Sequence, residues 1–442
     1  MFVGREAELN FLENNYNSDD SRIIVVYGQR GVGKTTLLER FSRNKKSSYF
    51  AARACSPTEQ RYQWGCEQRE AGREVSRFPE YAELFQNAVR DEEYGKQIII
   101  IDEFHHSVKN DSDFMQEIIR FMHSRPASKP VMFLLCTSAS GWVENSMIKR
   151  MGSTALSIGG LLKVREMKFA EICKLFPGYS GEDYIAIYSI LGGIPGLWNS
   201  FRTDYSARDN IIKNFLSKES RLYGEMSVIL SEDLREPAVY STILAALARG
   251  LHKLNDIYKH TGFSRAKISV YLKNLMELEL VEKVYSFETS QETDTQKGIY
   301  RISNSYVRFY FRFIFPNLSL LQKVTAEEFY ERVVADAFPA FVEEAYRRIC
   351  RETVGEYTAS VGEWLGKSGS LDIVAADRNG SLIVAACSYA SRMNPEDYEW
   401  LLFCMKKAGI KDAVKLLFCE KGFSDKLREE AMKGNVELRH IL

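Results

Sequence analysis

Gly28-Gln29-Arg30-Gly31-Val32-Gly33-Lys34-Thr35 is a phosphate-binding sequence of the pattern G-x-x-x-x-G-K-[ST]. The apolar, β-branched run 22–27 before it predicts a buried parallel strand, and the composition of 36–41 after it predicts a helix. In such a strand–loop–helix unit, backbone N–H groups surround a triphosphate at the positive end of the helix. We therefore expect a nucleotide site, with Lys34 on the β- and γ-phosphates and Thr35 holding Mg²⁺. The residues expected to line it are Gly28, Gln29, Arg30, Gly31, Val32, Gly33, Lys34, Thr35 and Thr36.

A second buried strand is predicted to end in two carboxylates. Four consecutive isoleucines, 98–101, are followed by Asp102 and Glu103. Ligands of open parallel sheets bind at the carboxyl ends of the strands. We expect Asp102 to act on the Mg²⁺ side of the site, and Glu103 to orient and polarise an attacking water.

A third apolar run, 131–136, leads into Thr137-Ser138. One of these hydroxyls, Ser138 in our assignment, would contact the γ-phosphate or the water, although Ser and Thr also simply begin turns. Helical patterns such as 113–122 alternate with the strands. This alternation predicts an α/β fold with a parallel, doubly wound sheet.

The composition limits the class of protein. The chain has 442 residues, too many for one core, so about two to four domains are expected. Lys and Arg number 59, as do Asp and Glu, and the net charge is zero. This balance argues against capture of nucleic acid by bulk charge and leaves a local basic face open. The sequence has no signal segment and no apolar stretch of about 18 residues, so we expect a soluble, cytoplasmic protein without membrane contact.

The eight cysteines are scattered along the chain, without a C-x-x-C pair. Several lie in apolar runs, as Cys136 does, so reduced thiols in the cores are expected rather than zinc ligands or disulfides. The pair His105-His106 is not part of an H-E-x-x-H or comparable spacing. Beyond a nucleotide-bound Mg²⁺, we expect no metal site.

Together these motifs resemble those of the archaeal-type ATPases, in the AAA+-related STAND class of P-loop proteins. The resemblance is carried by Phe2-Val3-Gly4-Arg5-Glu6, the P-loop, Ile101-Asp102-Glu103-Phe104, Thr137-Ser138 and Leu191-Gly192-Gly193-Ile194-Pro195. It implies ATP as the nucleotide and a helical lid that carries the Gly-x-Pro element. By this resemblance Val3, Arg5 and Pro195 would flank the adenine or ribose. From the residues alone, 192–195 would be an ordinary turn that ends a helix.

One element departs from the family pattern. Many relatives carry an arginine in a Gly-Arg-Arg-like element shortly after the third strand, whereas this chain has Ile158-Gly159-Gly160-Leu161. An arginine there would stabilise charge that develops during phosphoryl transfer. Without it, we expect hydrolysis to be slow.

A winged helix-turn-helix is predicted in the middle of the chain. Helices are expected at 240–247, 254–260 and 265–277, the last capped by Ser264, and strands at 280–285 and 297–302. The third helix would read duplex DNA. The side chains that it would offer are Arg265, Lys267 and Lys273.

The charge of this module leaves its use open. Residues 240–305 contain nine Lys or Arg against seven Asp or Glu. The expected hairpin tip carries Glu288, Glu292 and Asp294, which would repel phosphates. Packing or contact with another protein is therefore the alternative to DNA binding.

The C-terminal part resembles the restriction-endonuclease-like domain that some archaeal-type ATPases carry. An aromatic-rich bridge at 306–317, expected to be core, precedes a predicted helix at 338–351 and strands at 370–376 and 381–389. Such nucleases use an acid on the first strand and Glu-x-Lys on the next, so that two carboxylates hold Mg²⁺ and the lysine activates water.

The key positions of that nuclease pattern are incomplete here. Asp372 matches the first acid, and Glu343 or Glu344 could supply the helical one. The Glu and Lys positions hold Ala386 and Ser388. One carboxylate of the strand pair is not enough for the metal site, so we expect a domain without nuclease activity.

The predicted organisation is an ATPase core at 1–160, a helical lid at 161–225, the winged helix at 226–305 and the nuclease-like domain at 306–442. The predicted function is a regulatory ATPase that binds ATP and Mg²⁺, hydrolyses ATP slowly and changes its domain arrangement with nucleotide state. The alternative is a DNA-binding regulator that uses ATP as a structural switch without significant turnover. A protein partner and the oligomeric state are left open.

Overall fold

The computed structural model describes residues 2–89, 95–232, 236–287 and 298–442. The chain divides into two compact units. The first comprises Met1–Met167, Ile194–Gly196 and Glu277–Glu279, and the second comprises the rest. Within the described residues, no helix combines the length and the apolar character needed to cross a membrane.

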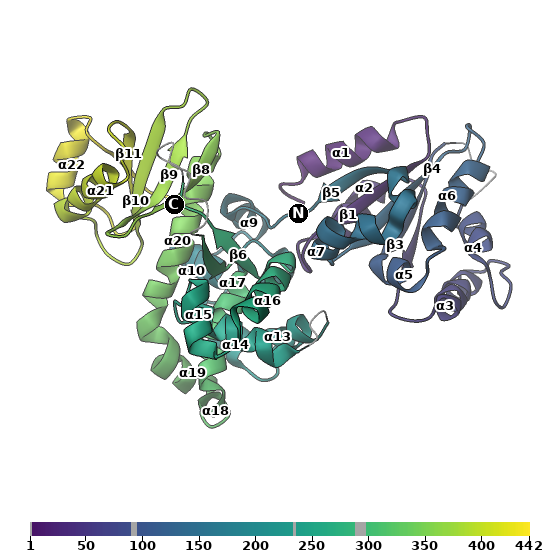
Figure 1. The fold of residues 1–442 in the computed structure, drawn as a ribbon, viewed down its shortest axis with the longest axis horizontal. Coiled ribbons are helices and arrows are strands. Elements are labelled where there is room, and N and C mark those ends of the chain that lie inside the picture. The colour runs from purple at the N-terminus through teal and green to yellow at the C-terminus, as the bar shows by residue number, and fades with distance from the viewer. Residues whose placement is uncertain (1, 90–94, 233–235, 288–297) are drawn as a thin grey trace. The chain divides into compact units, whose positions relative to one another are not determined.

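In the first unit strands alternate with helices, as the sequence predicts (Figure 1). The sheet has the strand order β2-β3-β4-β1-β5, and all neighbouring strands are parallel. The strands are β1 (Arg22–Tyr27), β2 (Ser47–Ala51), β3 (Gln97–Asp102), β4 (Val131–Thr137) and β5 (Ile158–Lys163). The helices are α1 (Glu6–Tyr16), α2 (Lys34–Ser42), α3 (Pro57–Glu70), α4 (Tyr81–Ala88), α5 (His105–Asn110), α6 (Phe114–Ser124), α7 (Ser140–Trp142) and α8 (Ile148–Met151).

Both faces of this sheet are buried, which explains why its strands are apolar at consecutive positions. Ile23 and Val25 of β1 enter a core shared with α3, α4 and α6. Ile24 and Val26 enter a second core shared with α1 and α2. The alternation of side chains along a strand thus divides one apolar run between two helical layers.

The strand order brings three motifs that are distant in sequence to one edge of the sheet. Strand β4 lies between β1 and β3 and runs parallel to both. The P-loop follows β1, Asp102-Glu103 ends β3, and Thr137-Ser138 ends β4. Neighbouring carboxyl ends therefore carry all three motifs, as expected for a ligand site of a parallel sheet.

The second unit begins with helices and ends with a mixed sheet (Figure 1). Its strand order is β12-β11-β10-β9-β8, with β8, β9 and β10 antiparallel and β10, β11 and β12 parallel. The strands are β8 (Ser360–Leu365), β9 (Ser370–Ala376), β10 (Leu382–Ser388), β11 (Val414–Cys419) and β12 (Glu437–Arg439). Its helices include α9 (Phe169–Leu175), α10 (Gly181–Leu191), α11 (Pro195–Trp198), α12 (Ala207–Ile211), α13 (Arg221–Glu232), α17 (Ser305–Phe309), α18 (Leu318–Leu321), α19 (Ala326–Phe329), α20 (Phe338–Gly355), α21 (Pro395–Lys407) and α22 (Asp425–Met432).

A helix-turn-helix with an antiparallel hairpin lies in the middle of this unit. Its elements are α14 (Pro237–Ala248), α15 (Leu254–Thr261), α16 (Arg265–Glu277), β6 (Val281–Val284) and β7 (Ile299–Ile302). Ser264 caps α16 by accepting a hydrogen bond from the Lys267 N–H at 3.2 Å. The expected fold class, a P-loop parallel sheet followed by a winged helix and a C-terminal α/β region, is confirmed. The acidic tip residues Glu288, Glu292 and Asp294 lie outside the described residues.

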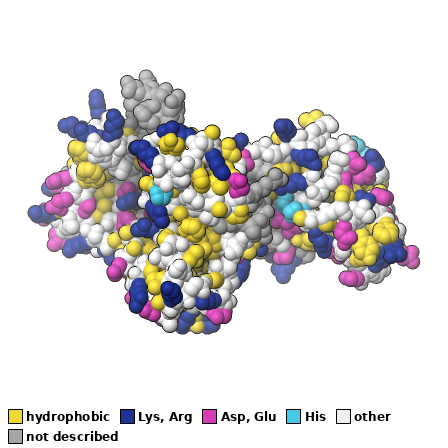
Figure 2. All heavy atoms as spheres, turned by 60° about the horizontal axis from the view of Figure 1, so that its bottom comes forward, with side chains coloured by type: hydrophobic (Ala, Val, Ile, Leu, Met, Phe, Trp, Pro, Cys, Tyr) yellow, Lys and Arg dark blue, Asp and Glu magenta, His cyan; other side chains and the backbone are white. Residues whose placement is uncertain are grey.

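The cysteines and the charged side chains are distributed over both units. All eight cysteines are free. In the described part of the chain, no group of three or more His, Cys, Asp or Glu residues is arranged to hold a metal ion. Both cationic and anionic side chains occur on the face drawn in Figure 2.

Candidate functional site

The phosphate-binding loop joins β1 to α2, and glycines set its path. Gly33 has φ 96°, a left-handed conformation that residues with a side chain rarely adopt. A Cβ at Gly28 would lie 2.1 Å from the Val164 carbonyl oxygen, so a side chain does not fit there. Helix α2 begins at Lys34, and the N–H groups of its first turn lack partners within the helix. The loop and helix therefore form a cradle suited to an anion.

Lys34 lies inside this loop. Its side chain is buried, and Nζ donates to the carbonyl oxygens of Gly28 at 2.8 Å and Gln29 at 3.0 Å. Phosphate oxygens are stronger acceptors for an ammonium group than neutral carbonyls are. Thr35 and Thr36 are exposed in the first turn of α2, where their hydroxyls are open to a ligand.

The N-terminal segment supports the loop through Arg5. This arginine is 7% exposed, and its Nη2 donates to the carbonyl oxygens of Val32 at 3.0 Å and Arg165 at 2.7 Å. Its Nη1 pairs with Glu8 Oε1 at 2.8 Å. Arg5 thus contacts the P-loop backbone. Its expected place beside the adenine or ribose, like that of half-buried Val3, stays a prediction.

The segment containing Pro195 also contacts the loop. The Gly196 N–H donates to the carbonyl oxygen of Gly31 at 2.9 Å. Gly192, with φ 58°, ends α10, as the reading of an ordinary turn predicts. The turn that ends a helix is therefore present, and contact of Pro195 with the adenine or ribose stays a prediction.

Asp102 is held at the end of β3 by two hydrogen bonds. Its Oδ1 accepts from the Glu103 N–H at 2.9 Å, and its Oδ2 accepts from the Tyr49 hydroxyl at 2.7 Å. Burial and the bond to Asp102 raise the pKa of Tyr49, so this hydroxyl remains a donor. Tyr49 lies on β2, the strand next to β3. The sequence did not single it out.

Glu103 is fixed by residues at the end of β4 and by a histidine. Its φ is 49°, a strained value for a residue with a side chain. Its Oε2 accepts from the Ser138 N–H at 3.0 Å and the Thr137 hydroxyl at 3.2 Å, and lies 3.2 Å from His105 Nδ1. Thr137 Oγ1 is also 2.8 Å from His105 Nδ1. The structure thus brings Glu103 together with both candidate hydroxyl residues, although Ser138 contacts it through the backbone.

These contacts set the charge of Glu103. Burial by itself would raise the pKa of this carboxyl, but hydrogen bonds from His105 and Ser138 outweigh it and lower the pKa to about 2. The carboxylate is therefore ionised at neutral pH, as a group that orients water requires. The role of His105 was missed from the sequence because its spacing matches no metal motif. Its signal was its position two residues after Glu103.

Helix α16 buries Ile268, Leu272 and Leu275, and its basic residues Arg265, Lys267 and Lys273 are exposed or half-buried. Arg265 is exposed, but it donates to Asn255 Oδ1 at 2.7 Å and its guanidinium lies 4.2 Å from the centre of the Tyr258 ring.

Lys267 also has a partner, because its Nζ is 3.6 Å from Glu236 Oε2. Lys273 is exposed. Arg265 and Lys267 are therefore engaged within the second unit, and contact with DNA would have to compete with these interactions.

In the C-terminal part, an arginine lies between the two acids of the predicted nuclease site. Arg347 Nε is 3.2 Å from Asp372 Oδ1, and its Nη2 is 3.8 Å from Glu343 Oε1. The other oxygen of Asp372 accepts from the Cys387 N–H at 2.9 Å. Glu344, the second helical candidate, pairs instead with Arg308 at 3.0 Å.

Three segments of the chain match known protein families. Residues 2–200 match an ATPase domain found predominantly in Archaea. Residues 241–283 of this ATPase-containing chain match the arsR family of bacterial regulatory proteins, which supports the helix-turn-helix. Residues 310–398 match a family of archaeal and bacterial proteins of unknown function.

Two proteins and one solved structure illustrate what this chain is similar to. An uncharacterized protein of Methanocaldococcus jannaschii is 27% identical over 408 residues, covering 86% of this chain and 85% of that protein. An uncharacterized ATP-binding protein of the same organism is 50% identical over 46 residues, covering 10% of this chain and 78% of that protein. The solved Walker-type ATPase of Pyrococcus abyssi has a TM-score of 0.51 at 17% identity, covering 70% of this chain and 96% of that one, which shows a shared fold.

Proposed function

We propose that this chain is a slow, Mg²⁺-dependent ATPase whose nucleotide state is passed to its second unit. The observation that supports this most strongly is the convergence of three motifs at the carboxyl edge of one parallel sheet. There the P-loop, Asp102-Glu103 and Thr137-Ser138 follow adjacent strands. The match of residues 2–200 to an ATPase domain supports the same function.

Each residue then has a defined task. Lys34 would exchange its bonds to Gly28 and Gln29 for bonds to phosphate oxygens. Thr35 and Asp102 offer a hydroxyl and a carboxylate, the oxygen ligands that Mg²⁺ prefers. When bound, this ion would neutralise charge on the phosphates.

Glu103 would orient the attacking water, because its carboxylate is ionised and its position is fixed by Ser138 and His105. Slow turnover follows from the Ile158–Leu161 stretch, which contains no arginine and forms part of strand β5. The cation at the end of this strand, Lys163, pairs with Glu144 and Glu279, so it would be a weaker source of the positive charge that stabilises a transition state. A purified chain that hydrolyses many ATP molecules per second would contradict this part of the proposal.

The second candidate function is a DNA-binding regulator in which ATP serves as a switch. The match of residues 241–283 to a family of regulatory proteins favours it. A contribution of α16 would appear as a steep loss of duplex affinity with salt, weakened by changing Arg265 and Lys267 to Ala. The partners of Arg265 and Lys267 within the second unit argue against a strong contribution.

The C-terminal α/β region is proposed to be a nuclease-like fold without a nuclease site. The order α20, β8, β9, β10, α21, β11 supports the fold. Arg347 places a guanidinium between Asp372 and Glu343, where a nuclease would need a cation between two acids. Cleavage of plasmid DNA by the full chain in Mg²⁺ or Mn²⁺ would overturn this assignment.

The main experiment is ATP turnover by the full chain, with and without duplex DNA. Lys34→Ala and Glu103→Gln are compared with matched controls on exposed residues of the first unit, Lys149→Ala and Glu70→Gln. We expect turnover to be lost in the first pair, by about 10²–10⁴-fold for Glu103→Gln, and kept in the controls. Stimulation by duplex would identify a DNA-linked ATPase, whereas equal turnover in all variants would refute the proposed site.

A further inference from the structure

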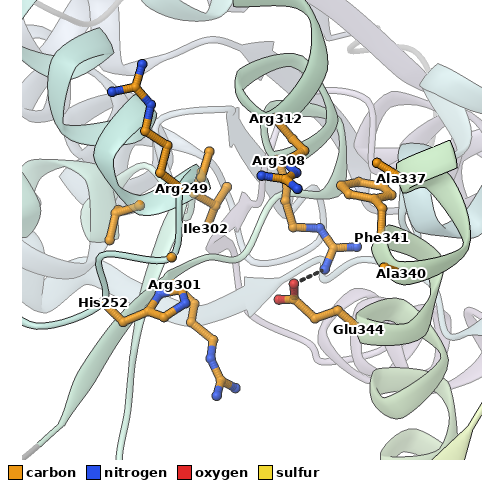
Figure 3. A pocket seen from close by; sticks show the side chains of 13 residues that line it. Arg249, His252, Arg301, Ile302, Arg308, Arg312, Ala337, Ala340, Phe341 and Glu344 are labelled. Carbon is orange, nitrogen blue, oxygen red and sulfur yellow. Dashed lines mark ion pairs between the residues drawn. The ribbon is translucent and has the colours of Figure 1, made fainter. Parts of the chain in front are cut away.

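The second unit contains a pocket of about 280 Å³ (Figure 3). Its walls come from the end of α14, from β7, and from the helical segments that carry residues 308–312 and 337–344. All of these residues belong to the second unit, whereas the P-loop, Asp102 and Glu103 belong to the first. The pocket therefore belongs to neither the nucleotide site nor the α16 surface.

Positive charge exceeds negative charge in the lining of this pocket. The lining contains one carboxylate, Glu344, and four arginines, of which Arg301 pairs with Glu363 outside the lining. The arginines are Arg249, Arg301, Arg308 and Arg312. Arg249 contacts His260 Nε2 at 3.1 Å, and Arg312 has neither an ion pair nor a hydrogen bond with any residue that the structure describes. Two guanidinium groups are thus without a carboxylate partner among the described residues.

Arg308 is the least exposed arginine of the pocket. Its side chain is 12% exposed, and its guanidinium lies 4.4 Å from the centre of the Phe341 ring. It pairs with Glu344 and reaches the Ser189 carbonyl oxygen at 3.3 Å, whereas its Nε has no hydrogen-bond partner among the described residues. Burial lowers the pKa of Arg308 because it disfavours the charged form. A second anion nearby would favour that charge.

Arg312 follows Arg308 by four residues along a helical segment. Like charges at this spacing repel each other, and an anion between them removes the repulsion. Figure 3 shows both side chains on the same side of the pocket, whereas the Arg249 guanidinium points away from Glu344. Arg308 and Arg312 are therefore the pair best placed to hold an anion.

The rest of the pocket is less polar. Figure 3 shows Phe341 on one side of the pocket, with Ile302 and His252 on the other. A ligand here would meet guanidinium groups at one end and hydrophobic side chains at the other. Small-molecule pockets generally begin near roughly 300 Å³, so the space suits a small ligand.

We propose that this pocket binds a small phosphorylated molecule, with its phosphate between Arg308 and Arg312 and its less polar part against Ile302 and Phe341. Guanidinium groups match phosphate oxygens in both charge and hydrogen-bonding geometry. Helix α16 contributes no residue to the lining, which argues against a phosphate of DNA read by that helix. The bound molecule would connect strand β7 of the winged helix with the segments after it, and would act as an effector if it bound one arrangement better than another.

The test is titration calorimetry on the full chain, with AMP and inorganic phosphate as probes. Lys34→Ala is used as the background, because it removes the phosphate-binding lysine of the P-loop. In this background we add Arg312→Ala, or Arg378→Ala as a control at an exposed arginine outside the pocket. We expect saturable binding that Arg312→Ala weakens about tenfold or more, since it removes a charged hydrogen-bond donor. Arg378→Ala should leave the affinity unchanged, and Arg312→Lys should keep part of it.

Three results would overturn the proposal. In the first, Arg312→Ala and Arg378→Ala bind the probes with equal affinity. In the second, neither AMP nor inorganic phosphate binds at millimolar concentration. In the third, Arg312→Ala weakens binding of duplex DNA but not of AMP or phosphate. Because Arg312 is exposed, its substitution is not expected to unfold the chain. Because both compared variants already carry Lys34→Ala, a difference in their affinities does not depend on ATP hydrolysis at the P-loop.

Discussion

Thr137 offers a sharp test of the geometry at the carboxyl edge of the first sheet. Its hydroxyl is fully buried and lies 3.2 Å from Glu103 Oε2, 2.8 Å from His105 Nδ1 and 3.1 Å from the Ala139 nitrogen. Thr137→Val keeps the shape and removes this oxygen. Leaving the buried Ala139 N–H without an acceptor costs about 1–3 kcal/mol, and losing the bonds to His105 and Glu103 costs about 1 kcal/mol each, so the variant should lose roughly 3–5 kcal/mol of stability.

Thr137→Ser is the matched control, because it keeps the oxygen and removes one buried methyl group worth about 1 kcal/mol. Unfolding of a chain with two units need not be a single transition. The measurement is therefore hydrogen exchange of the β3 and β4 amides in the full chain. A loss below about 0.5 kcal/mol in Thr137→Val, well short of an unsatisfied buried group, or equal losses in both variants, would refute the reasoning.

ATP turnover gives a second readout of the same pair. Glu103 would lose one of its donors in Thr137→Val and keep those from Ser138 and His105. We expect turnover to fall further in the valine variant than in the serine variant, with ATP affinity unchanged. A drop in affinity that matches the drop in turnover would show that Thr137 supports the loop instead.

The remaining predictions concern acid stability, the loop and the C-terminal sheet. Because the pKa of Glu103 is lowered from 4.5 to about 2, its stabilisation is present above pH 4.5 and is lost as pH falls toward 2; acid unfolding should show this loss, and Glu103→Gln should lack it. Arg5→Ala removes the bonds to Val32 and Arg165, so we expect about 1.5–3 kcal/mol less stability in the first unit by hydrogen exchange, and no change would contradict the supporting role. Arg347→Ala leaves the Asp372 carboxylate without its guanidinium partner, and should destabilise the second unit by about 1–3 kcal/mol in urea, with Arg347→Lys recovering part of the loss.

Strong local patterns made much of the fold predictable. The strand at 22–27, the helix at 265–277 and the strand at 370–376 have the expected bounds. In each segment, apolar residues form a clear pattern, and a capping residue or a turn marks one end. The strand β5 was not predicted, because Gly159 and Gly160 interrupt its apolar pattern and glycine weakens a strand.

At the carboxyl edge of the first sheet, the sequence predicted only those residues that belong to one continuous motif. Asp102 and Glu103 follow a buried strand directly, so their position was apparent. Tyr49 was not, because its contact with Asp102 depends on β2 pairing with β3, which local sequence does not specify. The role of His105 depends likewise on β4 lying beside β3.

The arginine of the C-terminal site had a signal that was available in the sequence. Arg347 follows Glu343 by four residues, a spacing that places both on one face of a helix. Its contact with Asp372 required the packing of α20 against β9. Helix periodicity alone therefore could not show that a guanidinium stands between the two acids.

We propose that Lys34 binds the phosphates of ATP and that Glu103 orients the water that attacks them. If so, replacing Lys34 should weaken ATP binding, whereas replacing Glu103 should not. The measurement is the equilibrium affinity of the full chain for ATP with Mg²⁺, taken for wild type, Lys34→Ala and Glu103→Gln. We predict an affinity within a few-fold of wild type for Glu103→Gln and a loss of roughly tenfold or more for Lys34→Ala, since only the latter removes a charged donor to phosphate. Equal affinities in wild type and Lys34→Ala would contradict the account.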